Sequence, residues 1–332
     1  MNIPLFEKLH REGLISSASL EKAKSDPSNK LFSLHWEIKT LLYLGVLLLT
    51  SGLGILVYKN IDTIGHQAIL AFILAVSLGS FAYCFNKKLP FATEKVASTN
   101  PFFDYILLLA CLTFIIFIGY IQYEYKIFGE RYGLATFFPM AVLFFSAYYF
   151  DHLGILSLAI TNLGAWLGLT VTPLKLYQSN DFNSTPIIIT GLLLSVFLFV
   201  MEQVTIKKNI KKHFAFTYAN FGLHILFVSC LAALVKFDTT YLLWFLLLLV
   251  IAYVLYRRSL LQRSFYFIVF ITLYSYIGLS YVVVRLLSSI PYSSGIGSGV
   301  IMLGFFYFIF SGIGLIVFLI HTNRKIKNHD SL

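Results

Sequence analysis

The residues of this chain that are best suited to chemistry lie inside long apolar segments. His224 is near the centre of the apolar segment 214–234, Asn220 lies one turn before it, and Thr217 lies on the same side. This spacing places three polar side chains in a stripe along one face of a helix. An ionisable group at the middle of a bilayer is costly, so it normally faces the interior of a bundle or an aqueous cavity. The stripe therefore predicts a polar substrate path, and the alternative is a neutral His224 that hydrogen-bonds to a neighbouring helix as structural glue.

Two other apolar segments offer polar groups to the same path. Asn162 is central in the fifth segment, where helix packing alone would also explain it. The ninth segment carries Tyr274, Tyr281 and Arg285 along one face. Arg285 could hold an anionic substrate or a lipid head group, or its side chain could extend to the outer membrane interface. The candidate substrate-path residues are Asn162, Asn220, His224, Tyr274, Tyr281 and Arg285.

A further polar group follows the first apolar segment, in the predicted outer loop between the first two spans. Asn60, Asp62 and His66 have the side-chain types that bind cations, but one carboxylate makes a poor site for a hard ion. Helix termination is the alternative, with Asn60 and Asp62 as capping residues. The apolar segments also contain no Ser-His-Asp, paired-carboxylate or HExxH arrangement. We therefore predict no catalytic residue, no metal and no cofactor, and enzymatic activity is left without support.

Long apolar helices must position all of these residues. The chain is 58% hydrophobic and 12% charged, whereas soluble domains are about half apolar and a quarter charged. The run from Thr40 to Tyr58 has no charge, and at about 1.5 Å per residue it nearly matches the hydrocarbon core of a bilayer. We predict an all-α polytopic membrane bundle of about ten transmembrane helices. The predicted spans are 40–58, 68–85, 103–122, 133–150, 153–172, 186–204, 214–234, 240–256, 265–286 and 297–320.

The distribution of basic residues predicts the orientation. Of the 25 Lys and Arg residues, 19 fall in segments on the side of the N-terminus and six on the other side. This asymmetry is typical of a protein with both termini in the cytoplasm, so the net charge of +10 does not indicate nucleic acid. We predict a cytoplasmic helical hairpin over 1–39, a transmembrane bundle over 40–320 and a cytoplasmic tail over 321–332.

The count of ten spans depends on one very short turn. Only Asp151 and His152 separate the fourth and fifth spans, and a single broken re-entrant element there would change the orientation of everything downstream. We expect Asp104, Asp151, His152 and Glu202 to lie at or near the membrane interfaces, where charges are tolerated.

The first part of the chain resembles a known family. The resemblance is carried by Leu9 to Ser16, by the glycine-bearing stretch Leu44 to Gly54, and by Asn60-Ile61-Asp62. This part of the chain resembles bacterial predicted membrane proteins of the domain of unknown function twenty-one-fifty-seven. Members have a short helical N-terminal segment, a first span rich in Gly and Leu, and an Asn-Trp-Asp-like triplet at its outer end, where this chain has Ile61 in place of Trp. The resemblance implies a multi-pass protein of the bacterial cytoplasmic membrane and names no activity.

Two classes of function remain open from the sequence. The first is a permease-like or lipid-handling protein, a transporter in the broad sense, with a polar path at the bilayer midplane and a small solute or lipid as its substrate. The second is a non-catalytic membrane scaffold or sensor whose N-terminal hairpin docks a protein partner. An intramembrane enzyme is a more distant third. The lipid bilayer is a partner in every case, and nucleic acid in none.

Overall fold

The computed structural model describes residues 10–12, 16–17, 34–96, 101–129, 132–171, 184–290 and 296–328. Within these ranges the chain is helical and contains no strand. Most of the predicted N-terminal hairpin and the end of the C-terminal tail lie outside the described residues.

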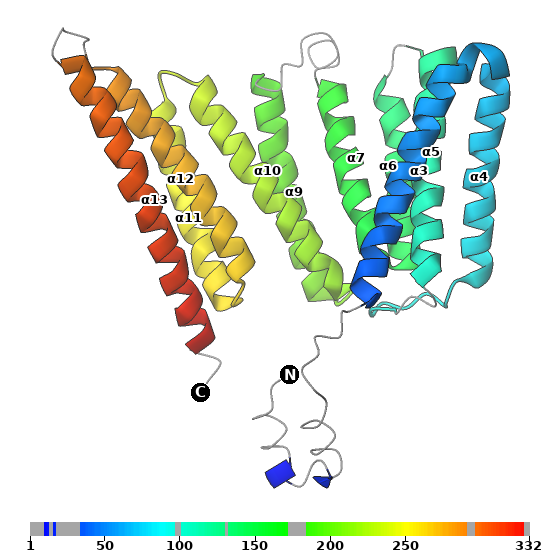
Figure 1. Ribbon diagram of the computed structural model, residues 1–332, viewed down its shortest axis with the longest axis horizontal. Coiled ribbons are helices and arrows are strands. Elements are labelled where there is room, and N and C mark those ends of the chain that lie inside the picture. The colour runs from blue at the N-terminus through cyan, green and yellow to red at the C-terminus, as the bar shows by residue number, and fades with distance from the viewer. Residues whose placement is uncertain are drawn as a thin grey trace. The chain divides into compact units, whose positions relative to one another are not determined.

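Ten α-helices and one short 3-10 helix make up the described part of the chain (Figure 1). Each α-helix covers one predicted span with ends that differ by a few residues, so the all-α prediction is confirmed. The largest differences are the first helix, which begins before its predicted span, and the last, which continues past it. The helices are α3 (Leu34–Ile64), α4 (His66–Lys87), α5 (Pro101–Tyr125), α6 (Tyr132–Phe150), α7 (Leu153–Val171), α9 (Thr185–Lys208), η1 (Lys212–Phe214), α10 (Ala215–Lys236), α11 (Tyr241–Leu261), α12 (Phe265–Ser288) and α13 (Ile296–Asn328).

Length and composition identify the membrane spans. Eight helices of the described residues are long and apolar enough to cross a bilayer. The other two contain shorter apolar stretches, Thr40–Leu56 in α3 and Leu153–Gly168 in α7. The protein is therefore a polytopic helical membrane bundle.

The chain forms two compact units. Unit 1 comprises Met1–Phe85 and Ser98–Thr113, and unit 2 comprises Asn86–Ala97 and Phe114–Leu332. In unit 1, the buried hydroxyl of Ser77 on α4 donates a hydrogen bond of 3.1 Å to the carbonyl oxygen of Ala110 on α5. A small polar residue that bonds to the backbone of the next helix allows close packing without a buried unsatisfied group.

A tight hairpin joins α6 and α7 in unit 2. Asp151 adopts the left-handed backbone region with a φ of 60°, and the Nδ1 atom of His152 accepts a hydrogen bond of 3.1 Å from the amide of Ile155. The first feature reverses the chain and the second caps the start of α7. Asp151 and His152 thus form a true two-residue turn between two separate helices that pack closely against each other.

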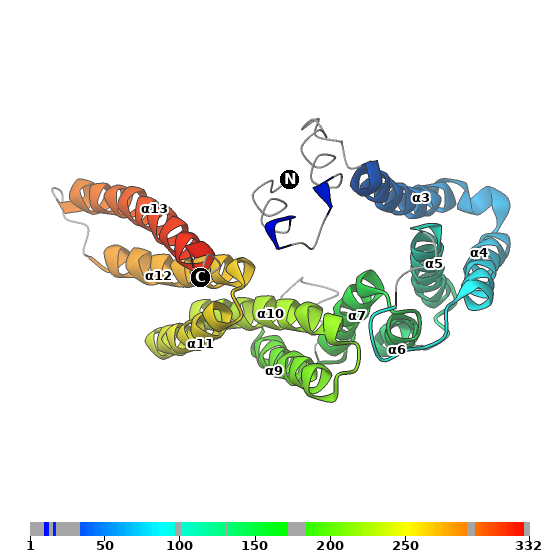
Figure 2. The ribbon, with the colours of Figure 1, turned by 90° about the horizontal axis from the view of Figure 1, so that it is seen from below.

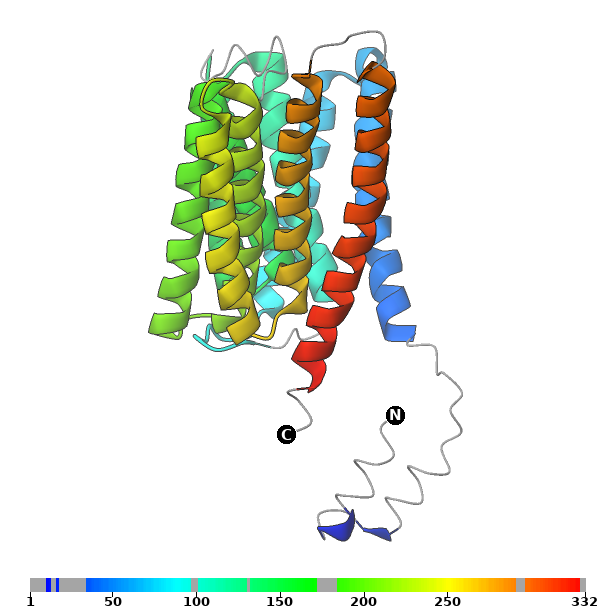
Figure 3. The same ribbon diagram turned by 90° about the vertical axis from the view of Figure 1, so that its left-hand side faces the viewer.

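Helix α10 is the centre of unit 2. It packs against α7, α9, α11 and α12, as Figure 2 shows from below. The contact with α9 is very close, since the hydroxyl of Ser229 leaves no room for a Cβ atom at Gly191. On the other side, Phe227 of α10, Leu248 of α11 and Ile271 of α12 belong to one buried apolar core. Helix α13 packs against α12 (Figure 3).

The helices of unit 2 alternate in direction, so several connections lie at the same end. Figure 1 shows the turns between α6 and α7, α9 and α10, and α11 and α12 at one end, together with the C-terminal end of α13. We call this the basic end. Its Lys and Arg residues include Lys207, Lys208, Lys211, Lys212, Arg257, Arg258, Arg263, Arg324 and Lys325.

Candidate functional site

Two hydrogen-bonded pairs connect α10 to α12. The hydroxyl of Tyr266 donates a hydrogen bond of 2.9 Å to the Oδ1 atom of Asn220. The Nδ1 atom of His224 and the hydroxyl of Tyr274 share a hydrogen bond of 2.9 Å. Phe270 lies between the pairs on α12, with its ring centre 4.6 Å from that of His224 in an edge-to-face arrangement. We call these five residues the polar seam.

The geometry of the seam follows from helix periodicity. Asn220 and His224 are four residues apart, and Tyr266, Phe270 and Tyr274 repeat the same spacing on α12. Residues four apart project from the same face of a helix, so two such rows can meet along a shared line. The sequence identified the α10 row and Tyr274, but it did not identify Tyr266 as the partner of Asn220.

The seam lies at the margin of the bundle and not in its closed core. Tyr266 is 41% exposed, whereas Asn220, His224 and Tyr274 are half-buried. The neighbouring residues Thr217 and Phe227 on α10 are buried. The polar groups of the seam are therefore paired with one another while one side of them remains open.

Arg285 lies at the other end of α12 from Tyr266. Its guanidinium donates hydrogen bonds to the carboxylate and the carbonyl oxygen of Asp238, at 2.6 and 3.2 Å, and to the hydroxyl of Tyr281 at 3.2 Å. It also lies 4.2 Å above the centre of the Tyr241 ring. Arg285 thus folds back onto the α10–α11 connection, and an anionic ligand would have to compete with Asp238 for it.

Asn162 does not join the seam. Its amide nitrogen donates a hydrogen bond of 3.3 Å to the carbonyl oxygen of Leu158, one turn earlier in α7. Among the described residues, this bond keeps the half-buried side chain within its own helix. The structure therefore separates Asn162 from the other predicted path residues.

Asn60 and Asp62 are not in a loop, as we had expected. Helix α3 continues to Ile64, and the chain turns at Gly65, which has a φ of 82°, before α4 begins at His66. Gly65 provides the left-handed conformation that most other residues avoid. The prediction of a loop was wrong because a single glycine makes the turn; the side chains of Asn60 and Asp62 lie outside the described part.

The structure contains a buried ion cluster that the sequence did not indicate. The carboxylate of Asp151 lies 3.2 Å from the ammonium of Lys211 and 2.6 Å from the Nε2 atom of His213. The Asp151 and Lys211 side chains are only 2% and 1% exposed. We had expected Asp151 to lie at or near a membrane interface, where charges are tolerated. It does lie in the turn where α6 ends and α7 begins, but its carboxylate is buried and paired with Lys211 and His213, which the sequence did not indicate.

The buried ion cluster connects the segment between α4 and α5 to the α6–α7 turn and to the α9–α10 turn. The segment between α4 and α5 donates a hydrogen bond of 2.6 Å from the amide of Val96 to Asp151. Lys211, which has a φ of 50°, donates from its amide to the carbonyl oxygen of Thr93 at 2.7 Å and from its ammonium to that of Glu94 at 3.3 Å. Lys211 is one of four lysines between positions 207 and 212, so the sequence does not distinguish it from the other three.

A second buried acid was also unexpected. Glu202 of α9 is buried and forms an ion pair with Arg258 of α11. Its other carboxylate oxygen has no hydrogen-bond partner among the described residues. Ser259 and Gln262 help to line a small hollow beside it, with a volume of about 10 Å³. That volume is close to what a single water molecule needs.

Comparison with known proteins gives a family match over part of the chain and no activity. Residues 7–156 match the family model described as Predicted membrane protein (DUF2157), which confirms the resemblance of the N-terminal region. No curated protein and no solved structure matches the chain. The polar seam lies beyond the matched residues, so its role must be argued from its own geometry.

Proposed function

We propose that the protein is a permease-like, lipid-handling membrane protein in which the polar seam guides a lipid head group through the apolar interior. The observation that carries this proposal is the two partly exposed hydrogen-bonded pairs, Asn220 with Tyr266 and His224 with Tyr274. They lie on one line of α12, and Tyr281 and Arg285 continue that line toward the other end. From Tyr266 to Arg285 the helix rises about 28 Å, close to the thickness of a hydrocarbon core.

The seam keeps hydrogen-bonding capacity for a substrate. Each pair uses one donor and one acceptor, which among the described residues leaves the amide nitrogen of Asn220, the second ring nitrogen of His224 and lone pairs on both tyrosines. A head group could bond to these atoms without breaking either pair. Because one side of the seam is open, the acyl chains of the lipid could stay in the bilayer.

The cost of desolvation favours a path lined by polar groups over direct passage through hydrocarbon. A polar head group that crosses bare hydrocarbon loses its hydrogen bonds to water, and each unsatisfied group costs on the order of 2–7 kcal/mol. Fixed donors and acceptors along the helix replace part of that loss. A lipid also requires no large aqueous cavity, because only its head must leave the interface.

A scaffold or sensor is the alternative. It is favoured by the fact that the seam residues satisfy one another and that Asn162 bonds within α7, as expected of a packed anchor. In that case the polar groups act as interhelical glue, and the N-terminal segment docks a partner protein.

Reconstitution separates the two proposals. The full chain is placed in liposomes that contain a fluorescent phospholipid, and the rate at which the label moves between leaflets is followed by chemical quenching from outside. We expect the wild-type protein to accelerate exchange over protein-free liposomes. The double variant Asn220→Leu with His224→Leu should be slower by about tenfold, since it removes two polar contacts of roughly 0.6 kcal/mol or more each.

Tyr253→Phe is the matched control, because it removes a hydroxyl from an exposed position on α11. It should leave the exchange rate unchanged. If the folded wild-type protein does not accelerate exchange of any phospholipid head group tested, the lipid-handling proposal is wrong and the scaffold becomes the working model.

A further inference from the structure

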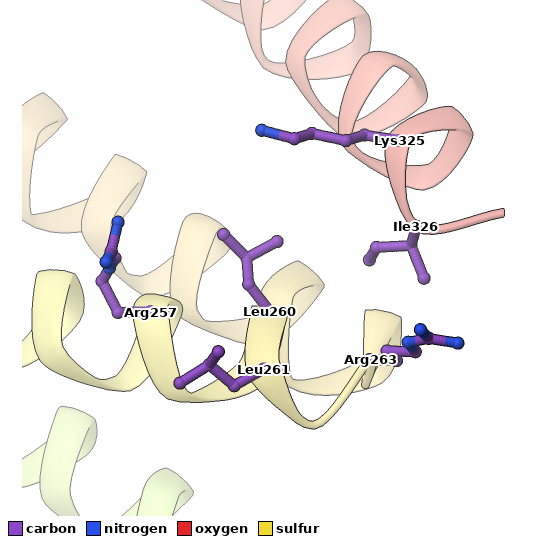
Figure 4. A pocket seen from close by; sticks show the side chains of 6 residues that line it. All are labelled: Arg257, Leu260, Leu261, Arg263, Lys325 and Ile326. Carbon is purple, nitrogen blue, oxygen red and sulfur yellow. The ribbon is translucent and has the colours of Figure 1, made fainter. Parts of the chain in front are cut away.

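A pocket lies at the basic end of unit 2, between the ends of α11 and α13 (Figure 4). Its volume is about 260 Å³. Helix α11 and the turn that follows it supply one wall, and the last turns of α13 supply the other. The lining residues are Arg257, Leu260, Leu261, Arg263, Lys325 and Ile326.

The polar part of this pocket is entirely cationic. In the described part of the chain, the six lining residues include two arginines and one lysine and no acid. Figure 4 shows the Lys325 side chain extending from α13 across the hollow and Arg257 pointing into the space on the α11 side, while Arg263 lies at the far edge near Ile326. Arg257 and Lys325 approach the same hollow from two sides, and like charges held near each other repel, so an anion between these two would stabilise this end of unit 2.

The apolar part of the pocket selects the kind of anion. Leu260, Leu261 and Ile326 line the pocket together with the cations, and Leu261 is 86% exposed. A leucine that exposed, at the last residue of α11, is explained if acyl chains cover it. Guanidinium groups bind phosphate oxygens with good geometry, and an ammonium binds them as a point charge. A phosphate joined to hydrocarbon satisfies both parts of the pocket.

We propose that this pocket binds the phosphate head group of an anionic phospholipid from the surrounding bilayer. Basic pockets between helix ends at the membrane surface are suited to such head groups. The pocket lies where α11 ends and α12 begins, which is the depth of the head-group layer. This binding site goes beyond the proposed function, because a lipid can be held here whether or not lipids move along the polar seam.

Lipid retention by the purified full chain tests the proposal. The protein is mixed in detergent with phosphatidylglycerol or phosphatidylcholine, and the number of bound lipids is measured by native mass spectrometry. We expect wild-type protein to prefer phosphatidylglycerol, and the double variant Arg257→Gln with Lys325→Gln to bind it about tenfold more weakly. Lys325→Arg, which keeps the charge, should retain binding.

The matched control is Lys207→Gln with Lys208→Gln, because both lysines are exposed on α9 at the same basic end and their removal changes net charge equally. An equal loss in this control would overturn the proposal, since binding would then depend on charge alone. Displacement of the lipid by millimolar inorganic phosphate would also overturn it, because the ligand would then be a free anion. The assay measures no transport, so a failure of lipid exchange in liposomes leaves its result intact.

Discussion

The buried ion cluster and the polar seam solve the problem of polar groups in an apolar protein in different ways. In the cluster, Asp151 and Lys211 are charged, almost fully buried and bonded on several sides. In the seam, Asn220 and His224 are half-buried, and each shares one bond with a tyrosine. The cluster has little capacity left for a ligand, whereas the seam keeps donors and acceptors beside an open side. The difference fits a structural role for the first and the binding role that we propose for the second.

The largest expected effect tests the structural half of this comparison. Asp151→Asn removes the charge that compensates Lys211, and breaking a buried ion pair on one side costs about 3–5 kcal/mol. We expect that loss in the free energy of unfolding, measured by denaturation in mixed micelles. Asp238→Asn serves as control, because Asp238 is 76% exposed and its ion pair with Arg285 should contribute nothing measurable. A loss as small as in the control would mean that water reaches the cluster.

A smaller loss is expected at the second buried acid. Glu202→Gln removes the partner of Arg258, but Arg258 is partly exposed and can turn toward water. We therefore expect a loss of about 1–3 kcal/mol in the same denaturation assay, less than for Asp151→Asn. If Glu202→Gln proved the more destabilising of the two, burial of the cation would not be what sets the cost.

Thiol labelling tests the open side of the seam. In a background without Cys84, Cys111 and Cys230, a cysteine at Asn220 should react with a membrane-impermeant reagent at least about tenfold faster than one at Ala219. Ala219 is the buried preceding residue of α10 and so provides a matched control. Equal protection of both positions, in intact cells and in inside-out vesicles, would show that the seam is dry and would favour the scaffold.

The smallest expected effect separates packing from function within the seam. Tyr274→Phe removes the hydroxyl that bonds to His224 but keeps the ring that stacks on Phe227. We expect it to lower the free energy of unfolding by only about 0.6 kcal/mol, the usual value for a hydrogen bond between membrane helices. The rate of lipid exchange should fall by more than this small loss of stability explains. If the rate and the free energy of unfolding changed in proportion, the bond would be structural glue alone.

The sequence determined the helices by itself. An apolar run of about twenty residues spans a bilayer whatever its neighbours are, because every backbone group in lipid must bond within its own helix. The sequence also located the break at Asp151 and His152, but it left open whether two separate helices or one re-entrant element flank it, and the structure shows two helices. Helix periodicity also predicted that Asn220 and His224 share one face.

Only the tertiary structure decided which polar residues meet. Helix spacing predicts the face of a side chain but not the helix that covers it, so Tyr266 could not be assigned to Asn220, nor Asn162 kept apart from them. Lys211 has three neighbouring lysines with the same chemistry, and only its left-handed turn aims it at Asp151, sixty residues earlier in the chain. Partners brought together by packing leave no periodic signal in the sequence, and in this protein those partners distinguish the buried ion cluster from the polar seam.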